Sequence, residues 1–319
     1  MVEVGDHHFF SMNQEIKITF GMIVLNGNHV LNECLKSIYP YAHKIIVCEG
    51  AVEYFVEQEG ITTSSDGTNE TLESFTDPEN KLIVIHGCAK EKTELCKKWF
   101  AHVPEETTHV WCIDSDEIFK SEHIEQIIEI LKTNNPESVS FKSRTFFGGF
   151  EHTLNGFERN VDFKRLLRYE PHCEYSEHRP PTLSCEDKNG VHLSGNHLFT
   201  VYGIEMYHYS YSDIQVVHNK TTYYKRAVSK ENCIDNYFND VYLKWVFGNE
   251  SQRAEIEHKY NGVHEFKPEY RGDCRTEMFT GEHPEEIKKS MDRLIAKHKE
   301  QKQMFLLPFC KQIVKPESK

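Results

Sequence analysis

Residues 110–117, VWCIDSDE, place three carboxylates directly after a short apolar run. The run from Val110 to Ile113 has the composition of a buried strand. Ligands of an open parallel sheet bind just beyond the carboxyl ends of its strands. Side chains two positions apart on a strand point the same way, so Asp114 and Asp116 can face one cation together. The stretch therefore predicts a site for Mg²⁺ or Mn²⁺, which commonly complete their coordination with substrate phosphates.

The segments around this stretch alternate between strand-like and helix-like patterns. Apolar runs predict five strands, at residues 18–25, 44–48, 81–85, 110–113 and 138–147. Apolar residues at helical spacing predict helices at residues 30–38, 68–75 with Thr68 as N-cap, 93–103 and 121–131. This alternation predicts an α/β fold, in which helices flank a mainly parallel, doubly wound sheet.

The second half of the chain has a weaker pattern. Residues 148–203 are rich in Gly, Pro, His and aromatic residues, which predicts strands and long loops that flank the first sheet. Residues 207–211 are β-prone, and further helices are expected at 214–230, at 233–246 and after His283-Pro284. We expect one domain over residues 17–315, with halves at 17–147 and 148–315, after a flexible N-terminus at residues 1–16.

The charge balance limits the partners of this chain. Its formal net charge is −13, which disfavours nucleic acid and anionic membrane surfaces as partners. The sequence contains no apolar stretch of the length that a membrane span needs and no visible signal peptide, so we expect a cytoplasmic protein. None of the ten cysteines forms a C-x-x-C pair, and we expect them to act as small buried hydrophobes.

Four stretches in this order resemble the GT-A fold glycosyltransferases, specifically the family-2-like group. They are GMIVLNGNHVLNECLKSI at 21–38, KIIVCEG at 44–50, SSDGT at 64–68 and VWCIDSDE at 110–117. The resemblance implies a Rossmann-like nucleotide-sugar-binding half and an acceptor-side half. It also implies transfer of a sugar from a nucleotide-diphosphate donor, with a UDP-sugar as the first choice, to a hydroxyl group of a glycan or glycoconjugate. Mn²⁺ or Mg²⁺ would stabilise the departing diphosphate.

The same resemblance implies roles for individual residues. Leu25 and Asn26 would line the nucleotide site, and Asp66 would lie in the turn that closes over the nucleotide. Glu49 would contact the base or the ribose, although the family usually has Asp at this position. Asp114 would face the ribose or the metal. Asp116 would ligate the metal and thereby take part in catalysis.

Two further roles need residues from the second half. Enzymes of this fold often add a histidine to the metal, and His208 in MYHYS is our candidate. An inverting transferase also needs a base that takes the proton of the acceptor hydroxyl. Glu177 is the best candidate for that base, and the alternatives are Glu174, Asp162 and His178. The stereochemical course, inverting or retaining, stays open.

Two other elements of the second half have open interpretations. Lys220, Lys225 and Arg226 on a predicted helix would reach a phosphate or lie exposed in solvent. The segment 146–150, FFGGF, is either an aromatic platform for the acceptor or core with a glycine turn.

Three other functions are compatible with parts of the pattern. A glycoside hydrolase needs two carboxylates about 5–5.5 or 6.5–9.5 Å apart around the scissile bond, whereas Asp114 and Asp116 suit a shared cation. A nucleotidyltransferase often has a glycine-rich basic phosphate loop, which Asn26-Gly27-Asn28 matches poorly. A catalytically inactive carbohydrate-binding protein of the same fold would differ from the transferase in showing no donor turnover.

Overall fold

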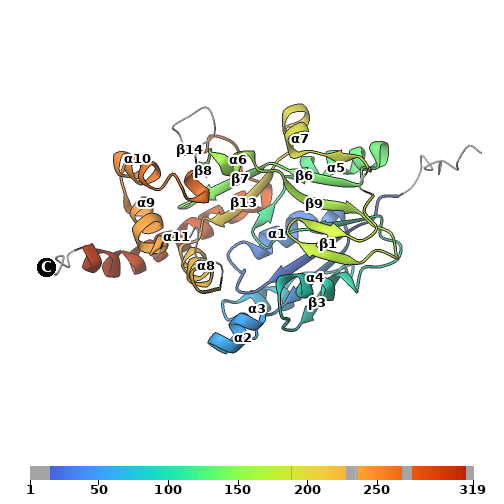
Figure 1. Cartoon of the computed structure of the whole chain (residues 1–319), viewed down its shortest axis with the longest axis horizontal. Helices are drawn as coiled ribbons and strands as arrows, with labels where there is room; N and C mark the ends of the chain where they lie inside the picture. The colour runs from blue at the N-terminus through green and yellow to red at the C-terminus, as the bar shows by residue number, and fades with distance from the viewer. Residues whose placement is uncertain (1–14, 188, 228–233, 235, 268–274, 314–319) are drawn as a thin grey trace, which may run out of the picture.

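The computed structural model describes residues 15–187, 189–227, 234, 236–267 and 275–313. Its centre is a seven-stranded sheet in the order β12-β6-β9-β4-β1-β2-β3 (Figure 1). The strands are β1 (Ile18–Val24), β2 (Ala42–Glu49), β3 (Leu82–His86), β4 (His109–Cys112), β6 (Ser138–Phe141), β9 (Phe163–Arg168) and β12 (His192–Leu193). Neighbouring strands are parallel except at β9, which is antiparallel to both β4 and β6. The expected α/β fold with a mainly parallel sheet flanked by helices is confirmed.

The inner strands β1, β2 and β4 of this sheet are largely buried on both faces, whereas the edge strands β3 and β12 are less buried. In β4 and the residue after it, Trp111 and Ile113 belong to one hydrophobic cluster, whereas Val110 and Cys112 belong to another. The first cluster includes residues of α1 (Leu31–Ile38), α5 (Ser121–Asn134) and α11 (Glu285–Ile313). The second includes residues of α4 (Lys92–Phe100) and of the hairpin β10 (Tyr175–His178) and β11 (Pro181–Leu183). Burial on both faces explains why these strands read as continuous apolar runs in the sequence.

The contact between α4 and the sheet depends on a glycine in β1. The Trp99 ring of α4 lies directly over Gly21, where an added Cβ would be 2.3 Å from the nearest ring carbons. Because no other residue lacks a Cβ, this close approach requires glycine at position 21.

A second, five-stranded sheet has the order β14-β8-β7-β13-β5. Its strands are β5 (Glu117–Ile118), β7 (Ser143–Phe147), β8 (His152–Leu154), β13 (Met206–Tyr211) and β14 (Thr276–Met278). The single strand predicted at 138–147 is therefore wrong: β6 and β7 are separated at Lys142 and belong to different sheets. The apolar pattern runs through both strands, so the sequence does not show where the chain changes sheets.

Several helices follow in the second half, of which α7 (Gly195–Tyr202) packs on β6 of the first sheet and the others lie on or beside the second sheet. The others are α6 (Phe157–Asn160), α8 (Ile214–Ala227), a π-helix at Phe238–Leu243, α9 (Lys244–Phe247), α10 (Glu250–Lys259) and the short 3₁₀ turn η4 (His264–Phe266). Three large aromatic side chains, Phe147, Tyr242 and Trp245, form the middle of the cluster between β7 and these helices. The expected helix at 233–246 is only partly realised, and Cys233 lies outside the described residues. The sequence pattern had not predicted α7 or α10.

Other local expectations are corrected by the structure. Gly67, and not Thr68, is the N-cap of α3 (Thr68–Glu73). Cys173 and Cys185 form a disulfide, contrary to the expectation that every cysteine is a buried thiol. Four of the other described cysteines are buried as expected, namely Cys34, Cys48, Cys96 and Cys112.

The expected flexible N-terminus falls almost entirely on residues outside the described part of the chain. Among the described helices, none combines the length and apolar character that crossing a bilayer requires.

Candidate active site at the end of strand β4

The three carboxylates after β4 lie in a tight turn. Strand β4 ends at Cys112, and the Glu117 N–H donates to the Asp114 carbonyl at 3.1 Å before β5 begins. Asp114 and Asp116 thus occupy a turn instead of extending the strand, and the reasoning from strand geometry was wrong on this point. The turn sends their carboxylates to different partners.

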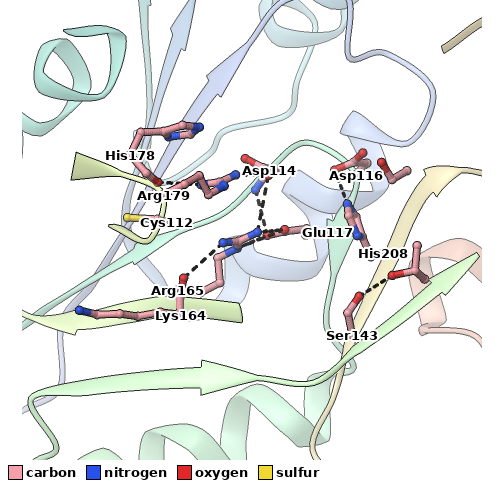
Figure 2. A network of polar contacts seen from close by, with 12 residues as sticks. Cys112, Asp114, Asp116, Glu117, Ser143, Lys164, Arg165, His178, Arg179 and His208 are labelled. Carbon is pink, nitrogen blue, oxygen red and sulfur yellow. Dashed lines mark hydrogen bonds and ion pairs between the residues drawn. The ribbon is translucent and has the colours of Figure 1, made fainter. Parts of the chain in front are cut away.

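Asp114 is paired with two arginines (Figure 2). Its Oδ2 atom forms an ion pair with Nη2 of Arg179 and lies 3.7 Å from Nη2 of Arg165. Burial alone would raise the pKa of Asp114, but the two guanidiniums hold it well below its usual range. The carboxylate is therefore an anion whose charge is already balanced by protein groups.

Glu117 and Arg165 form a buried ion pair beneath this turn. Glu117 is 0% exposed and Arg165 is 3% exposed. The Nε atom of Arg165 donates to both carboxylate oxygens at 3.1 and 2.9 Å, while Oε2 also accepts the Asp114 N–H at 3.2 Å. The pair fixes the conformation of the turn. Sequence reasoning missed the role of Arg165, because three of the six residues of FKRLLR are charged and nothing in the pattern marks Arg165 as the one that is buried.

Asp116 and His208, which the sequence analysis proposed as metal ligands, face each other in the structure. β13 lies antiparallel to β5 with His208 opposite Glu117, and the Tyr209 N–H donates to the Asp116 carbonyl at 2.8 Å. Nε2 of His208 lies 3.5 Å from Oδ1 of Asp116. Burial would raise the pKa of Asp116, but His208 outweighs it and lowers this pKa to about 2. Burial would lower the pKa of His208, but Asp116 outweighs it and raises that pKa.

The pair could supply two ligands to a divalent cation. Among the described residues, no group of three or more His, Cys, Asp or Glu side chains forms a ready-made metal site. A separation of 3.5 Å between Oδ1 and Nε2 allows both atoms to bind one cation, with phosphate and water oxygens at the other positions. Asp114, by contrast, is occupied by Arg179 and Arg165.

The loop after β1 touches the carboxylate turn. Gly27 packs so closely on Ser115 that an added Cβ would lie 2.5 Å from its Oγ atom. The Cys34 thiol of α1 donates to the Glu117 carbonyl at 3.3 Å. Two of the four stretches that carry the family resemblance therefore meet in space.

A second pair of stretches is joined by hydrogen bonds. Asn26, which has a left-handed φ of 54°, accepts from the Ser65 N–H at 2.8 Å through its side chain. Its own N–H donates to the Ser64 hydroxyl at 2.8 Å. Asp66 accepts from the Asn28 N–H at 3.0 Å. These contacts place Asn26 and Asp66, with the half-buried Leu25 next to them, along one rim of the site.

Glu49 at the end of β2 binds the loop at Thr63 and Ser64, next to Asp66. It is 1% exposed and accepts hydrogen bonds from the Thr63 hydroxyl at 3.0 Å and the Ser64 N–H at 2.6 Å, and His86 Nδ1 lies 3.1 Å away. Burial would raise the pKa of Glu49, but His86 and these donors lower it. All of these partners are protein groups, so in this structure Glu49 holds the loop at Thr63 in place.

The hairpin β10–β11 carries the expected base. Glu177 is exposed, and its side chain has no hydrogen bond or ion pair within the described residues, although its backbone pairs with Thr182 in the hairpin. The alternative Asp162 is 2.8 Å from Lys142, the residue between β6 and β7, and accepts the Gly195 N–H, so it connects this link to α7. The imidazole of His178 contacts the Cys96 thiol at 3.3 Å, and burial together with Arg179 lowers its pKa to about 3.

The remaining candidates from the second half are the segment 146–150 and three basic residues, and the structure describes the surroundings of the segment and of Lys220. Phe146 is 0% exposed and stacks on Tyr209, so the segment 146–150 is core and not an acceptor platform. Lys220 donates to the Ser210 hydroxyl and lies 4.5 Å from the ring centre of Tyr211, on the side of β13 where His208 is located. The side chains of Lys225 and Arg226 lie outside the described residues.

Comparison with known proteins gives only distant similarity. No protein-family model and no characterised protein matches the sequence. The crystal structure of Staphylococcus aureus TarS 1–349 matches with a TM-score of 0.38 and 11% identity, over 78% of this chain and 82% of that one. The same fragment in complex with UDP-GlcNAc matches with a TM-score of 0.38 and 10% identity, over 78% and 82%. The 4-diphosphocytidyl-2C-methyl-D-erythritolsynthase from Anaerococcus prevotii matches with a TM-score of 0.30 and 12% identity, over 48% of this chain and 70% of that one. Similarity at this level carries no argument about function.

Proposed function

We propose that this chain is a glycosyltransferase. It moves a sugar from a nucleoside-diphosphate sugar, with a UDP-sugar as the first choice, to a hydroxyl group of a glycan or glycoconjugate. The observation that carries this proposal is the meeting of Asp116 and His208, which come from opposite halves of the chain and face each other at the end of β4. The order of the four sequence stretches supports it, because the rim at Asn26 and Asp66 and the turn at Asp114 and Asp116 are the places where the resemblance implies donor contacts.

The charges of the site favour a diphosphate only if a cation is present. Two guanidiniums, Arg165 and Arg179, balance two carboxylates, Glu117 and Asp114. The third carboxylate, Asp116, has only the imidazole of His208 as its partner among these groups. We therefore assign the cation to Asp116 and His208. When bound there, Mn²⁺ or Mg²⁺ would neutralise the charge that develops on the leaving diphosphate.

The protein residues position the donor around this point. Asn26 and Asp66 would line the nucleotide side of the site, and Glu49 would hold the loop at Thr63 against it. Arg179, whose side chain is 40% exposed, lies beside Asp114 and would limit the repulsion between that carboxylate and the phosphates. Arg165 would act through Glu117 and Asp114 as a positioning residue.

A thermal-shift experiment tests this proposal. The full chain is heated with UDP, CDP, GDP or ADP in the presence of Mn²⁺, Mg²⁺ or EDTA. One nucleoside diphosphate should raise the melting temperature only when metal is present. A ligand at 100 times its Kd stabilises the folded state by about 2.7 kcal/mol, which such a scan resolves easily. The variants Asp116→Ala and His208→Ala should lose this stabilisation, whereas the matched control His258→Ala, an exposed histidine on α10, should keep it.

Three results would count against this assignment. Stabilisation of equal size in EDTA, or its persistence in Asp116→Ala, would refute the cation site. Failure of every nucleoside diphosphate to stabilise the chain would refute the transferase. Release of the nucleotide from a nucleotide sugar distinguishes the enzyme from an inactive carbohydrate-binding protein, because only the enzyme turns the donor over.

A further inference from the structure

A buried glutamate, Glu158, is separated from His208 by the side chain of Thr145 and has no part in the donor site described above. Glu158 of α6 is 3% exposed. Its Oε1 atom accepts a hydrogen bond from the Thr145 hydroxyl at 3.3 Å. Thr145 of β7 is the register partner of His208 of β13, and it is itself fully buried. Glu158, Thr145 and His208 are therefore contiguous.

The other oxygen of Glu158 contacts a histidine that reaches solvent. Oε2 lies 2.9 Å from Nε2 of His264 in η4, and the His264 side chain is 53% exposed. The ring of His264 packs edge-on against Phe157, with 5.8 Å between the centroids. The structure gives Nδ1 of His264 no hydrogen bond within the described residues. The Glu158 carboxylate thus lies within ion-pair distance of one nitrogen of this imidazole, and the other nitrogen faces no hydrogen-bond partner among the described residues.

Charged groups from three elements act on this imidazole. Glu158 raises the pKa of His264, burial lowers it, Glu265 of the same turn raises it, and Lys220 of α8 lowers it. The net result is a raised pKa. Burial would raise the pKa of Glu158, but His264, His208 and Lys220 lower it, so Glu158 is an anion at neutral pH.

We propose that His264, oriented by Glu158, is the base that accepts the proton of the acceptor hydroxyl. This inference rests on the proposed function and on a direct displacement with inversion. The hydroxyl oxygen forms a bond to the anomeric carbon of the donor sugar. The bond from that carbon to the diphosphate oxygen breaks, and its electron pair stays on the diphosphate. The hydroxyl proton moves to Nδ1 of His264, the Glu158 carboxylate balances the new positive charge, and His264 later returns the proton to solvent.

This pair fits the task better than the residues singled out from the sequence. A general base works best when its pKa is near the operating pH, and the Glu158 carboxylate shifts the pKa of the His264 imidazole upward. Glu177 is an exposed glutamate whose side chain has no partner among the described residues, and Asp162 is bound to Lys142. His178 is protonated only in strong acid and contacts the Cys96 thiol.

Donor hydrolysis with water as the acceptor tests the assignment. UDP-GlcNAc is incubated with the full chain and Mn²⁺, and the release of UDP is measured from pH 5 to 9. His264→Gln should lower kcat by about a hundredfold or more, as expected for the loss of a general base. Glu158→Gln should lower kcat and also move the rising limb of the pH profile to lower pH, because the carboxylate no longer raises the pKa of His264. His258→Gln and Glu177→Gln should leave both the rate and the profile unchanged.

A second measurement does not need turnover. The pKa of His264 is followed by NMR titration of the histidine-labelled full chain, and it should lie above the usual value of about 6.5 and fall in Glu158→Gln. A wild-type pKa at or below the usual value, or a His264→Gln enzyme of normal kcat, would overturn the inference. Both variants should keep the metal-dependent stabilisation by the nucleoside diphosphate. Loss of that stabilisation in the wild type itself would instead mean that the transferase proposal has failed.

Discussion

Replacing Arg165 with methionine should destabilise the protein strongly. The substitution leaves Glu117, which is 0% exposed, as a buried carboxylate without its cation. Removal of one partner from a buried ion pair typically costs about 3–5 kcal/mol, because the remaining charge is neither solvated nor compensated. The substitution removes three hydrogen bonds at once, from Nε and Nη2 of Arg165 to the Glu117 carboxylate. We therefore expect a loss of free energy of unfolding within this range.

A double variant separates two contributions to the free energy of unfolding: the cost of a buried carboxylate without a cation, and the net contribution of the Glu117–Arg165 ion pair. Replacing both members, Glu117→Met with Arg165→Met, removes the charge as well as its partner, and such apolar exchanges are often nearly neutral. One hydrogen bond to Glu117, from the Asp114 N–H, has no substitute in the double variant. We therefore expect the free energy of unfolding of the double variant to be about 1 kcal/mol lower than that of the wild type, which is the net contribution of one such hydrogen bond.

Urea unfolding followed by circular dichroism measures these differences. The matched control is Lys132→Met, which removes an exposed lysine from the pair with Glu129 on α5 and should change the free energy of unfolding by less than about 0.5 kcal/mol. If Arg165→Met cost no more than this control, Glu117 would not be a buried anion. If the double variant were as unstable as Arg165→Met, the penalty would come from lost packing and the electrostatic reasoning would be wrong.

Three further perturbations have defined outcomes. Gly21→Val should lower the free energy of unfolding by about 1–3 kcal/mol in a urea titration, because the new side chain overlaps the Trp99 ring; an unchanged value would contradict the packing described here. The two cysteines of the Cys173–Cys185 disulfide are 12 residues apart in sequence. Reduction of this disulfide should lower the free energy of unfolding by up to about 3 kcal/mol, and calorimetry with and without reductant measures the difference. Because the pKa of Glu49 is lowered on folding, its contribution is present above the unfolded pKa of about 4.3 and is lost as pH falls through the folded value. The stability difference between wild type and Glu49→Gln should therefore be larger at pH 7 than at pH 3, and a difference independent of pH would refute this account.

The parallel part of the sheet was readable from the sequence for a physical reason. Strands buried on both faces need apolar residues at nearly every position, so β1, β2 and β4 appeared as continuous apolar runs. β9 was not recognised because its polar residues, including Arg165, interrupt that signal. It nevertheless lies at the centre of the sheet, where Glu117 compensates the charge of Arg165.

The candidate site was predictable where a motif was local. Asp116 and His208 were both singled out, and the structure brings them together. The partners of Asp114 were not predictable, since Arg179 reaches it from a hairpin that has no periodic pattern. The role of Glu158 was likewise hidden, because its partner His264 lies far along the chain and only the fold brings the two side chains together.

The way β5 joins the two sheets has a mechanical consequence. The turn at Asp114–Asp116 is covalently continuous with β4 of one sheet, while β5 pairs with β13 of the other. Asp116 is itself held to β13 by the Tyr209 N–H, so Asp116 and His208 would move together with the five-stranded sheet, and any shift of one sheet past the other would have to be taken up between Cys112 and Asp116. A cation held between these two side chains would therefore strengthen the connection of this turn to β13 and would leave the segment after Cys112 as the point where the two sheets can adjust to each other.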